Sequence, residues 1–196
     1  MKEKLFEGEL VRLTAEDAET IGKVFSNWSR NSEYTRLLDS EHSVLRSAKK
    51  IKEYVEKDLE KENPNNYFFT LRTLEEDRLI GFVNLMDIHW SHGDCWVGIG
   101  LGDSAYWGKG YGTDAMRVIL RYAFRELNLH RVTLGVFAYN LRAIRSYEKA
   151  GFKLEGTEKA LVMRDGSRAD IFIMGVLRRE WEEIHSIQQI EKGERK

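Results

Sequence analysis

The sequence predicts a single α/β domain built on a mixed sheet, and three observations support this class. Helical spacing of apolar residues before position 63 gives way to strand alternation after residues 63–66. Short turn-forming segments then join three strands, and a glycine-rich segment leads into alternating helices and strands. A length of 196 residues suits one domain, which we expect to span residues 1–185 and to end in a polar, flexible tail over 186–196.

The composition argues against several functional classes. Lys and Arg total 31 and Asp and Glu total 32, so the chain lacks the basic excess of a nucleic-acid binder and we expect no such partner. The single cysteine, Cys95, excludes an internal disulfide, and the histidines lack metal-ligand spacing, so we expect no metal. We find no secretory signal and no apolar run near the roughly 20 residues of a membrane span. We therefore expect a cytoplasmic protein without a membrane partner.

The residues before position 63 predict one short strand and two helices. Alternation over 9–13 indicates the strand, and residues 14–17 match the capping-box pattern that begins a helix. Apolar residues at helical spacing extend that helix over 15–29, and a second amphipathic pattern predicts a helix over 44–62. The many Lys and Glu residues of the second helix indicate a solvated face.

Strand and helix patterns alternate over the rest of the chain. The first three strands predict an antiparallel meander, because connections this short cannot join parallel strands. The expected elements are strands over 67–72, 79–88 and 95–101, a helix over 111–127, a strand over 131–137, a short helix over 140–150, and closing strands over 152–155, 160–163 and 169–176. Gly151 suits the left-handed position that commonly ends a helix.

The residues with most chemical meaning lie in the glycine-rich segment 98–113, between a strand and a helix. Gly108, Gly110 and Gly112 carry no Cβ, so their backbone N–H groups can approach an anion closely. The start of the following helix adds unpaired N–H groups and the positive end of its dipole, and Lys109 adds a cation. This arrangement predicts a phosphate or pyrophosphate cradle. The alternative is a flexible loop whose glycines serve close packing.

Two common nucleotide motifs do not match this segment. A P-loop requires Ser or Thr after its Gly-Lys pair, and Gly110 follows Gly108 and Lys109 here. A dinucleotide fingerprint reads Gly-x-Gly-x-x-Gly in an early βαβ unit, whereas this segment reads Gly-x-Gly-x-Gly and follows a meander. A phosphate-bearing ligand of another kind is therefore favoured.

Three segments, residues 106–115, 130–134 and 140–152, resemble the GNAT acyl-CoA N-acetyltransferases, in particular the ribosomal-protein alanine acetyltransferase (RimJ/RimL-like) branch. The resemblance implies a GNAT-type mixed, mostly antiparallel central sheet with helices on both faces and splayed strands that form the acyl-CoA cleft. It implies that acetyl-CoA is the acyl donor, and that its acetyl group passes by direct attack to a primary amine in a ternary complex.

The identity of the amine stays open at this point. A protein N-terminus and a small-molecule amine such as a polyamine both fit the resemblance. The alternative to an enzyme is a non-catalytic acyl-CoA-binding sensor or interaction module with the same fold. Family members are often dimers, so a homodimer is a further expectation, although nothing in the chain demands it.

The resemblance also assigns roles to individual residues of the cleft. Ile99, Gly100 and Leu101 would bond the pantetheine arm through their backbone, and Asn140 would bond the same arm. The loop formed by Trp107, Gly108, Lys109, Gly110, Tyr111, Gly112 and Thr113 would take the pyrophosphate, Arg145 would lie near the CoA phosphates, and Tyr147 would approach the thioester sulfur.

Physical chemistry supports some of these roles and offers alternatives. A tyrosine hydroxyl with a pKa near 10 can donate a proton to a departing thiolate, which suits Tyr147. Tyr147 could equally be a core aromatic residue, and Trp107 a packing residue beneath the loop. Asn140 is also a plausible helix N-cap, and that role is compatible with a contact to the ligand.

The general base and the acceptor site are predicted less directly. Asp87 and His89 end the strand before the cofactor strand, and Glu33 follows the first helix, so each is a candidate base. A solvated strand end is the alternative for Asp87 and His89. Trp28, Glu33 and Tyr34 lie in the connection where this family recognises its acceptor, and ordinary surface is the alternative there.

Overall fold

The computed structural model describes residues 4–58 and 63–184, and within them a seven-stranded sheet runs in the order β1-β2-β3-β4-β5-β7-β6. The strands are β1 (Val11–Thr14), β2 (Tyr67–Thr73), β3 (Leu79–His89), β4 (Asp94–Leu101), β5 (Arg131–Phe137), β6 (Lys153–Arg164) and β7 (Ser167–Leu177). The helices are α1 (Ala18–Trp28), α2 (Ser32–Leu38), α3 (Ala48–Asp58), α4 (Tyr111–Arg121) and α5 (Leu141–Ala150). All strand pairs are antiparallel except β4 with β5, so the expected mixed, mostly antiparallel sheet is confirmed.

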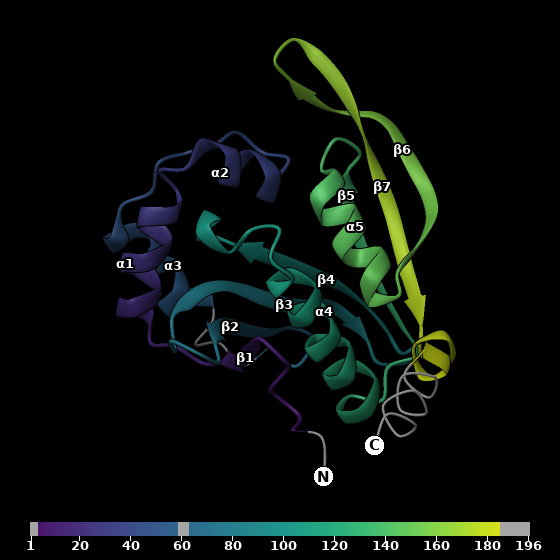
Figure 1. The fold of residues 1–196 in the computed structure, drawn as a ribbon. Helices are drawn as coiled ribbons and strands as arrows, with labels where there is room; N and C mark the ends of the chain where they lie inside the picture. The colour runs from purple at the N-terminus through teal and green to yellow at the C-terminus, as the bar shows by residue number, and fades with distance from the viewer. Residues whose placement is uncertain (1–3, 59–62, 185–196) are drawn as a thin grey trace.

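The helices cover both faces of the sheet because β2 and β3 alternate apolar side chains between two directions. Phe69 and Val83 join the core that contains α4, whereas Phe68 packs with residues of α1 and α3 on the opposite face. Figure 1 shows α1, α2 and α3 grouped on one side of the molecule, with the β6–β7 hairpin extending beyond α5 on the other. No helix of the described ranges is long and apolar enough to cross a bilayer.

Three local expectations need correction. The cap of α1 is Asp17, whose side chain accepts from Thr20 N, and not Thr14, whose hydroxyl bonds across to Thr70. Residues 32–38 form helix α2, begun by Asn31 as N-cap, where we expected only a connection. The strands expected over 152–155 and 160–163 are one strand, β6, with irregular pairing between Glu158 and Val162.

The ends of two expected elements lie outside the described residues. Helix α3 ends at Asp58, and residues 59–62 of the helix expected over 44–62 are not among those described. The tail expected over 186–196 also falls outside them.

Helix α4 anchors the N-terminal segment through a buried carboxylate. Asp114 accepts three backbone N–H groups, from Glu9, Leu10 and Val11, at 3.0, 2.7 and 3.0 Å. The Arg121 side chain, on the same helix, donates to the backbone carbonyl oxygens of Leu5 and Glu7. These charge-assisted bonds hold the segment before β1 against α4. They therefore also fix the position of α4 relative to the sheet.

The sheet opens between β4 and β5. These two strands pair in parallel over three residue pairs, from Asp94 with Arg131 to Trp96 with Thr133. Beyond Trp96 they diverge, and the remainder of β4 keeps its partner β3 on the other side. One edge of β4 therefore presents unpaired backbone groups to the space between the two halves of the sheet.

The tip of the β6–β7 hairpin crosses this opening and contacts the chain after α2. Arg164 Nη2 donates to three consecutive carbonyl oxygens over residues 39–41, at 2.8 to 2.9 Å. Arg36 of α2 pairs with Asp165 at 2.5 Å. Exposed ion pairs contribute little to stability. We therefore infer that these contacts mainly fix the position of the β6–β7 hairpin relative to α2.

We predict that Asp114→Ala lowers the free energy of unfolding by about 3 kcal/mol, because three backbone N–H groups lose a charged acceptor that is itself buried. Urea denaturation measures the loss. Glu53→Ala on the exposed face of α3 is the control and should change stability by less than about 0.5 kcal/mol. Equal effects of the two substitutions would contradict the anchoring role of Asp114.

Candidate functional site

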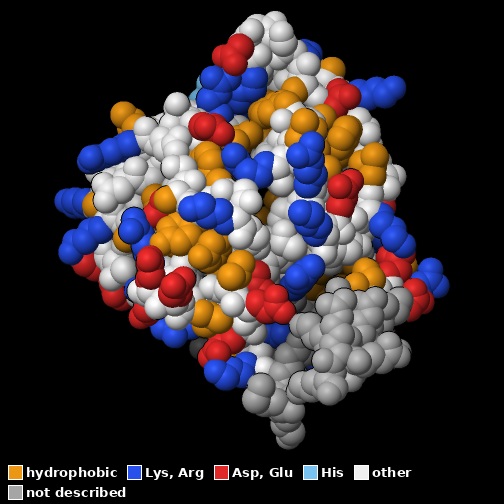
Figure 2. Space-filling model, in the orientation of Figure 1, with side chains coloured by type: hydrophobic (Ala, Val, Ile, Leu, Met, Phe, Trp, Pro, Cys, Tyr) orange, Lys and Arg blue, Asp and Glu red, His pale blue; other side chains and the backbone are white. Residues whose placement is uncertain are grey.

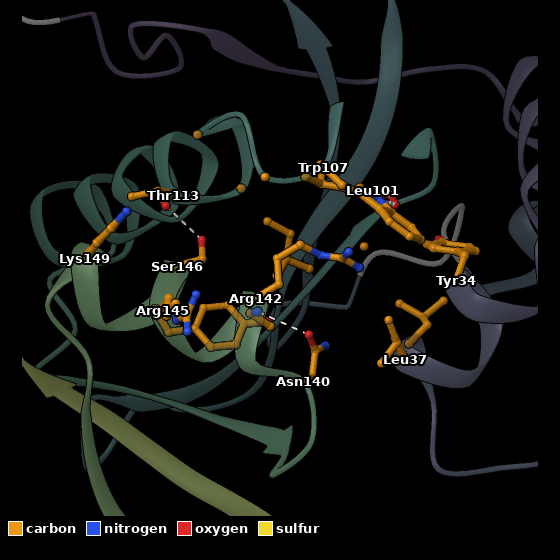
Figure 3. A pocket seen from close by; sticks show the side chains of 18 residues that line it. Tyr34, Leu37, Leu101, Trp107, Thr113, Asn140, Arg142, Arg145, Ser146 and Lys149 are labelled. Atoms are coloured by element: carbon orange, nitrogen blue, oxygen red, sulfur yellow. Dashed lines mark hydrogen bonds between the residues drawn. The ribbon is translucent and has the colours of Figure 1, made fainter. Parts of the chain in front are cut away.

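A cavity of about 400 Å³ lies where β4 and β5 diverge. Ile99, Gly100 and Leu101 of β4 form one wall. Helix α5 forms the facing wall, and Tyr34, Leu37 and Leu38 of α2 close one end. Figure 3 shows these side chains converging on the cavity from α2, α5 and the loop before α4.

The glycine loop borders the cavity with backbone rather than side chains. Gly108 and Gly110 have φ angles of +72° and +94°, a conformation that L side chains rarely adopt. Gly110 is the N-cap of α4 and offers no side-chain cap, so the N–H groups of the first turn, Tyr111 to Thr113, have no intrahelical partner. A helix start of this kind, next to a cavity, suits a bound phosphate.

Cationic side chains of α5 line the same cavity. Arg142, Arg145 and Lys149 all contribute to its lining, and Figure 2 shows blue side chains gathered over α5 on this face. The Arg142 guanidinium lies 4.0 Å from the centroid of the Trp107 ring and 3.7 Å from Glu33. Arg142 therefore links the loop, α5 and α2 across the cavity.

Trp107 connects the loop to the diverging strand. Its Nε1–H donates to the Leu101 carbonyl oxygen at 2.7 Å, and its ring lines the cavity. This bond satisfies a carbonyl at the free end of β4, and it holds Gly108 and Gly110 beside that strand. The packing role considered for Trp107 and its place in the cavity wall are thus compatible.

Asn140 begins α5 and lies in the cavity wall. Its Oδ1 accepts from Ala143 N at 3.2 Å, so the cap role is present in the structure. The Thr113 and Ser146 hydroxyls are 2.9 Å apart and join the first turn of α4 to the middle of α5 (Figure 3).

Two tyrosines line the cavity, Tyr34 from α2 and Tyr147 from α5. Burial raises the pKa of Tyr147 to about 12, and burial also raises the pKa of Tyr34 well above its usual range. A group whose neutral form is favoured keeps its proton at physiological pH. Both phenols are therefore proton donors and not phenolates.

Asp87 and His89 are not among the residues that line the cavity. In the β3–β4 register Val83 faces Ile99, whereas His89 faces Asp94 at the closed end of the hairpin. His89 is six positions along the strand from Val83, which corresponds to about 20 Å. Both Asp87 and His89 are exposed and line neither the cavity nor the groove beside it, so their position matches the solvated strand end considered as the alternative.

Other expected site residues take several positions. Trp28 is 8% exposed and packs behind β4, so it lies in the core and not in the cavity lining. Glu33 is exposed and paired with Arg142, while Tyr34 lines the cavity. Lys109 and Tyr111 do not line it, and the Tyr111 ring packs edge-on against Tyr106.

Sequence reasoning missed Arg142, Ser146 and Lys149 as lining residues. Together with Arg145 they are spaced by three or four residues, which places them on one face of α5. That spacing was available from the sequence. Its meaning depended on knowing which face of the helix points toward β4.

A larger groove of about 1180 Å³ adjoins the cavity on the face that carries α1 and α3. Tyr34 and Leu38 line both spaces, so the two meet beneath α2. Within residues 4–58 and 63–184, no three His, Cys, Asp or Glu side chains are grouped closely enough to hold a metal ion.

Comparisons with known proteins point to one family. A family model described as "Acetyltransferase (GNAT) domain" matches residues 9–153. The chain is 39% identical over 140 residues to "Probable N-acetyltransferase YjcK" of Bacillus subtilis, covering 71% of this chain and 75% of that protein.

Solved structures share the fold at lower identity. The spermidine N-acetyltransferase of Vibrio cholerae in complex with CoA and spermine superposes with a TM-score of 0.76 at 24% identity, covering 87% of this chain and 97% of that one. An acetyltransferase (GNAT family) from Bacillus anthracis gives a TM-score of 0.73 at 19% identity, covering 89% and 98%.

We predict that Gly102→Ala destabilises the protein by about 2–3 kcal/mol, because a Cβ at this position would lie 1.9 Å from the Trp28 ring that backs β4. Gly108→Ala is the control. Its Cβ would meet no atom within 4 Å, and the positive φ alone should cost about 1 kcal/mol. Thermal unfolding of both variants compares them, and a smaller loss for Gly102→Ala than for Gly108→Ala would contradict the packing described.

Proposed function

The chain belongs to the GNAT acetyltransferase family as an acyl-CoA-dependent N-acetyltransferase, and we propose that it transfers the acetyl group inside the β4–β5 cavity. In this proposal acetyl-CoA occupies the cavity and the loop before α4, and a primary amine arrives from the adjoining groove. The observation that carries the proposal is the meeting of a free strand edge, an uncapped helix start and three cations around one cavity.

The cavity residues fit the chemistry of coenzyme A. The N–H groups of Tyr111, Gly112 and Thr113 suit the pyrophosphate, because Gly110 leaves the start of α4 without a side-chain cap. Arg145 and Lys149 supply positive charge on the facing helix. The unpaired edge of β4 at Ile99–Leu101 suits the amide groups of the pantetheine arm, with Asn140 as a further polar contact.

Acetyl-CoA supplies an acyl group activated as a thioester. An N–H of the free β4 edge is suited to stabilise the negative charge that develops on the carbonyl oxygen as the amine nitrogen attacks. Tyr147 stays protonated at Oη, because burial raises its pKa to about 12, and it can pass this proton to the sulfur as the carbon–sulfur bond breaks. The proton that the nitrogen loses as the amide forms then restores the neutral phenol, which burial favours.

The amine must lose a proton before it attacks, because a pKa near 10.4 keeps most of it charged at pH 7. Among the described residues that line the β4–β5 cavity there is neither a carboxylate nor a histidine. We therefore propose that the amine gives its proton to water in the groove before it reaches the cavity. Asp87 and His89 have no part in this proposal.

Several finer points also belong to this proposal. Residues 106–115 and 140–152 support the RimJ/RimL-like branch, in which a protein N-terminus would be among the acceptors. Leu154, Leu161 and Met163 are exposed on the edge strand β6, which supports a homodimer. A single domain over 1–185 and a cytoplasmic location stay predictions from the sequence.

We predict that Tyr147→Phe lowers kcat about 100-fold and leaves the affinity for CoA unchanged, because the phenyl ring keeps the packing and loses the proton. Thiol release from acetyl-CoA with a panel of primary amines measures kcat, and calorimetry measures CoA affinity. Tyr139→Phe is the matched control, because it removes a hydroxyl just before α5 and outside the cavity lining.

The pH profile checks the same assignment. A proton donor works below its pKa, and the pKa of Tyr147 is raised to about 12, so wild-type kcat should not fall between pH 7 and 10. Equal kcat for Tyr147→Phe and wild type would remove Tyr147 from the mechanism. Binding of CoA without thiol release for any amine would favour the sensor module over the enzyme.

A further inference from the structure

The groove beside the cavity has a wall of aromatic rings. Phe25, Phe68 and Phe82 all line it, and the Phe68 and Phe82 rings stack with centroids 5.5 Å apart. Phe25 and Phe82 are also separated by 5.5 Å between centroids. Ile51 and Val55 of α3, which pack in one cluster with Phe25 and Phe68, extend the apolar lining. A ligand in this groove would therefore bury apolar surface, which is favourable in proportion to its area.

The carboxylates of the groove already have partners. Glu16 accepts two bonds from Arg72, at 2.5 and 2.9 Å. Asp17 accepts from the N–H and the hydroxyl of Thr20 at the start of α1, and these bonds lower its pKa. Asp39 accepts from the Glu41 N–H at 3.0 Å.

The groove also contains basic side chains. Arg46 and His42 line it together with these three acids. A polycation loses its hydration water when it enters an apolar groove. Carboxylates of the groove must then pair with its charges to compensate for this loss. The aromatic wall offers no such carboxylate, because Glu16 is paired with Arg72, and Asp17 and Asp39 are exposed to water.

One polar group on the wall has no such donor. Asn84 of β3 lines the groove, and its Oδ1 is shielded from water and has no hydrogen-bond partner among the described residues. This oxygen lies over Gly98 of β4, where a Cβ would come within 2.6 Å of it, so a ligand N–H would form the missing bond once the amide turns toward the groove. The junction with the cavity lies at Tyr34 and Leu38, so an amine at that end could approach the thioester while its body stays in the groove.

We infer that the acceptor is a primary amine on a single apolar body of aromatic size, and not a polyamine. This inference rests on the proposed function, because it names the substrate class of the same site. It separates the chain from the structural neighbour whose complex contains spermine. An arylalkylamine and a peptide with an aromatic first residue share this chemistry.

Calorimetry on the protein saturated with CoA tests the inference without requiring turnover. Phenethylamine should bind at least about tenfold more tightly than spermidine, because one buried phenyl ring contributes that much. Equal or tighter binding of spermidine would overturn the inference. A tripeptide amide that begins with Phe is the third ligand, and tighter binding than phenethylamine would identify a peptide N-terminus as the source.

A variant pair tests where the selectivity arises. Val44 lines the groove and is 55% exposed, so Val44→Asp adds a carboxylate at a position that should tolerate it. This change should weaken phenethylamine and strengthen spermidine, which reduces the ratio of their affinities several-fold. Leu74→Asp, exposed after β2 and outside both the groove and the cavity, is the control and should leave the ratio unchanged.

Thiol release on the same amines distinguishes a failure of the proposed acetyl transfer from a failure of the inferred ligand class. Selective binding of phenethylamine without thiol release would contradict the proposed function and leave the ligand class supported. Thiol release with spermidine at a higher kcat/KM than with phenethylamine would support the proposed function and overturn the ligand class. An unchanged affinity ratio in Val44→Asp would also count against the groove as the site of selection.

Discussion

The separation of β4 from β5 after three paired residues is the constraint on which the rest of the site depends. A strand edge inside a protein cannot leave its N–H and carbonyl groups without partners unless water or a ligand supplies them. Trp107 satisfies the carbonyl of Leu101 and closes the end of the opening. The groups of β4 before it face a cavity, and this is why a ligand with amides of its own can pair with them.

The opening persists because both of its sides are fixed by contacts elsewhere. Asp114 and Arg121 hold the N-terminal segment against α4, and Trp28 packs against Gly102 behind β4. Arg164 then joins the hairpin tip to the chain after α2 across the opening. A cleft held in this way exists before any ligand binds, which lowers the ordering cost of binding.

Much of the fold and part of the site could be predicted from local sequence. Gly151 has the left-handed conformation expected of a residue that ends a helix, and Asn140 caps α5, because turn and cap preferences act over a few residues. The N-cap of α2 was also visible locally, since Asn31 precedes Ser32 and Glu33, but seven residues gave too few turns for a clear period.

The residues that depended on strand register could not be placed in this way. Asp87 and His89 are near β4 in sequence terms, yet the hairpin register puts them at the closed end of the sheet. Arg142 and Lys149 needed the orientation of α5, and the aromatic wall of the groove needed the packing of α1 and α3 against β2 and β3. Each is set by contacts between segments far apart in the chain, which no local pattern reports.

Amide hydrogen exchange with and without CoA tests the central claim most directly, because it reads the backbone groups themselves. We expect slower exchange for the amides of residues 97–101 and 108–113 when CoA is bound, and unchanged exchange at the tip of the β6–β7 hairpin. Protection confined to another surface, or no protection in these two segments at saturating CoA, would contradict this claim.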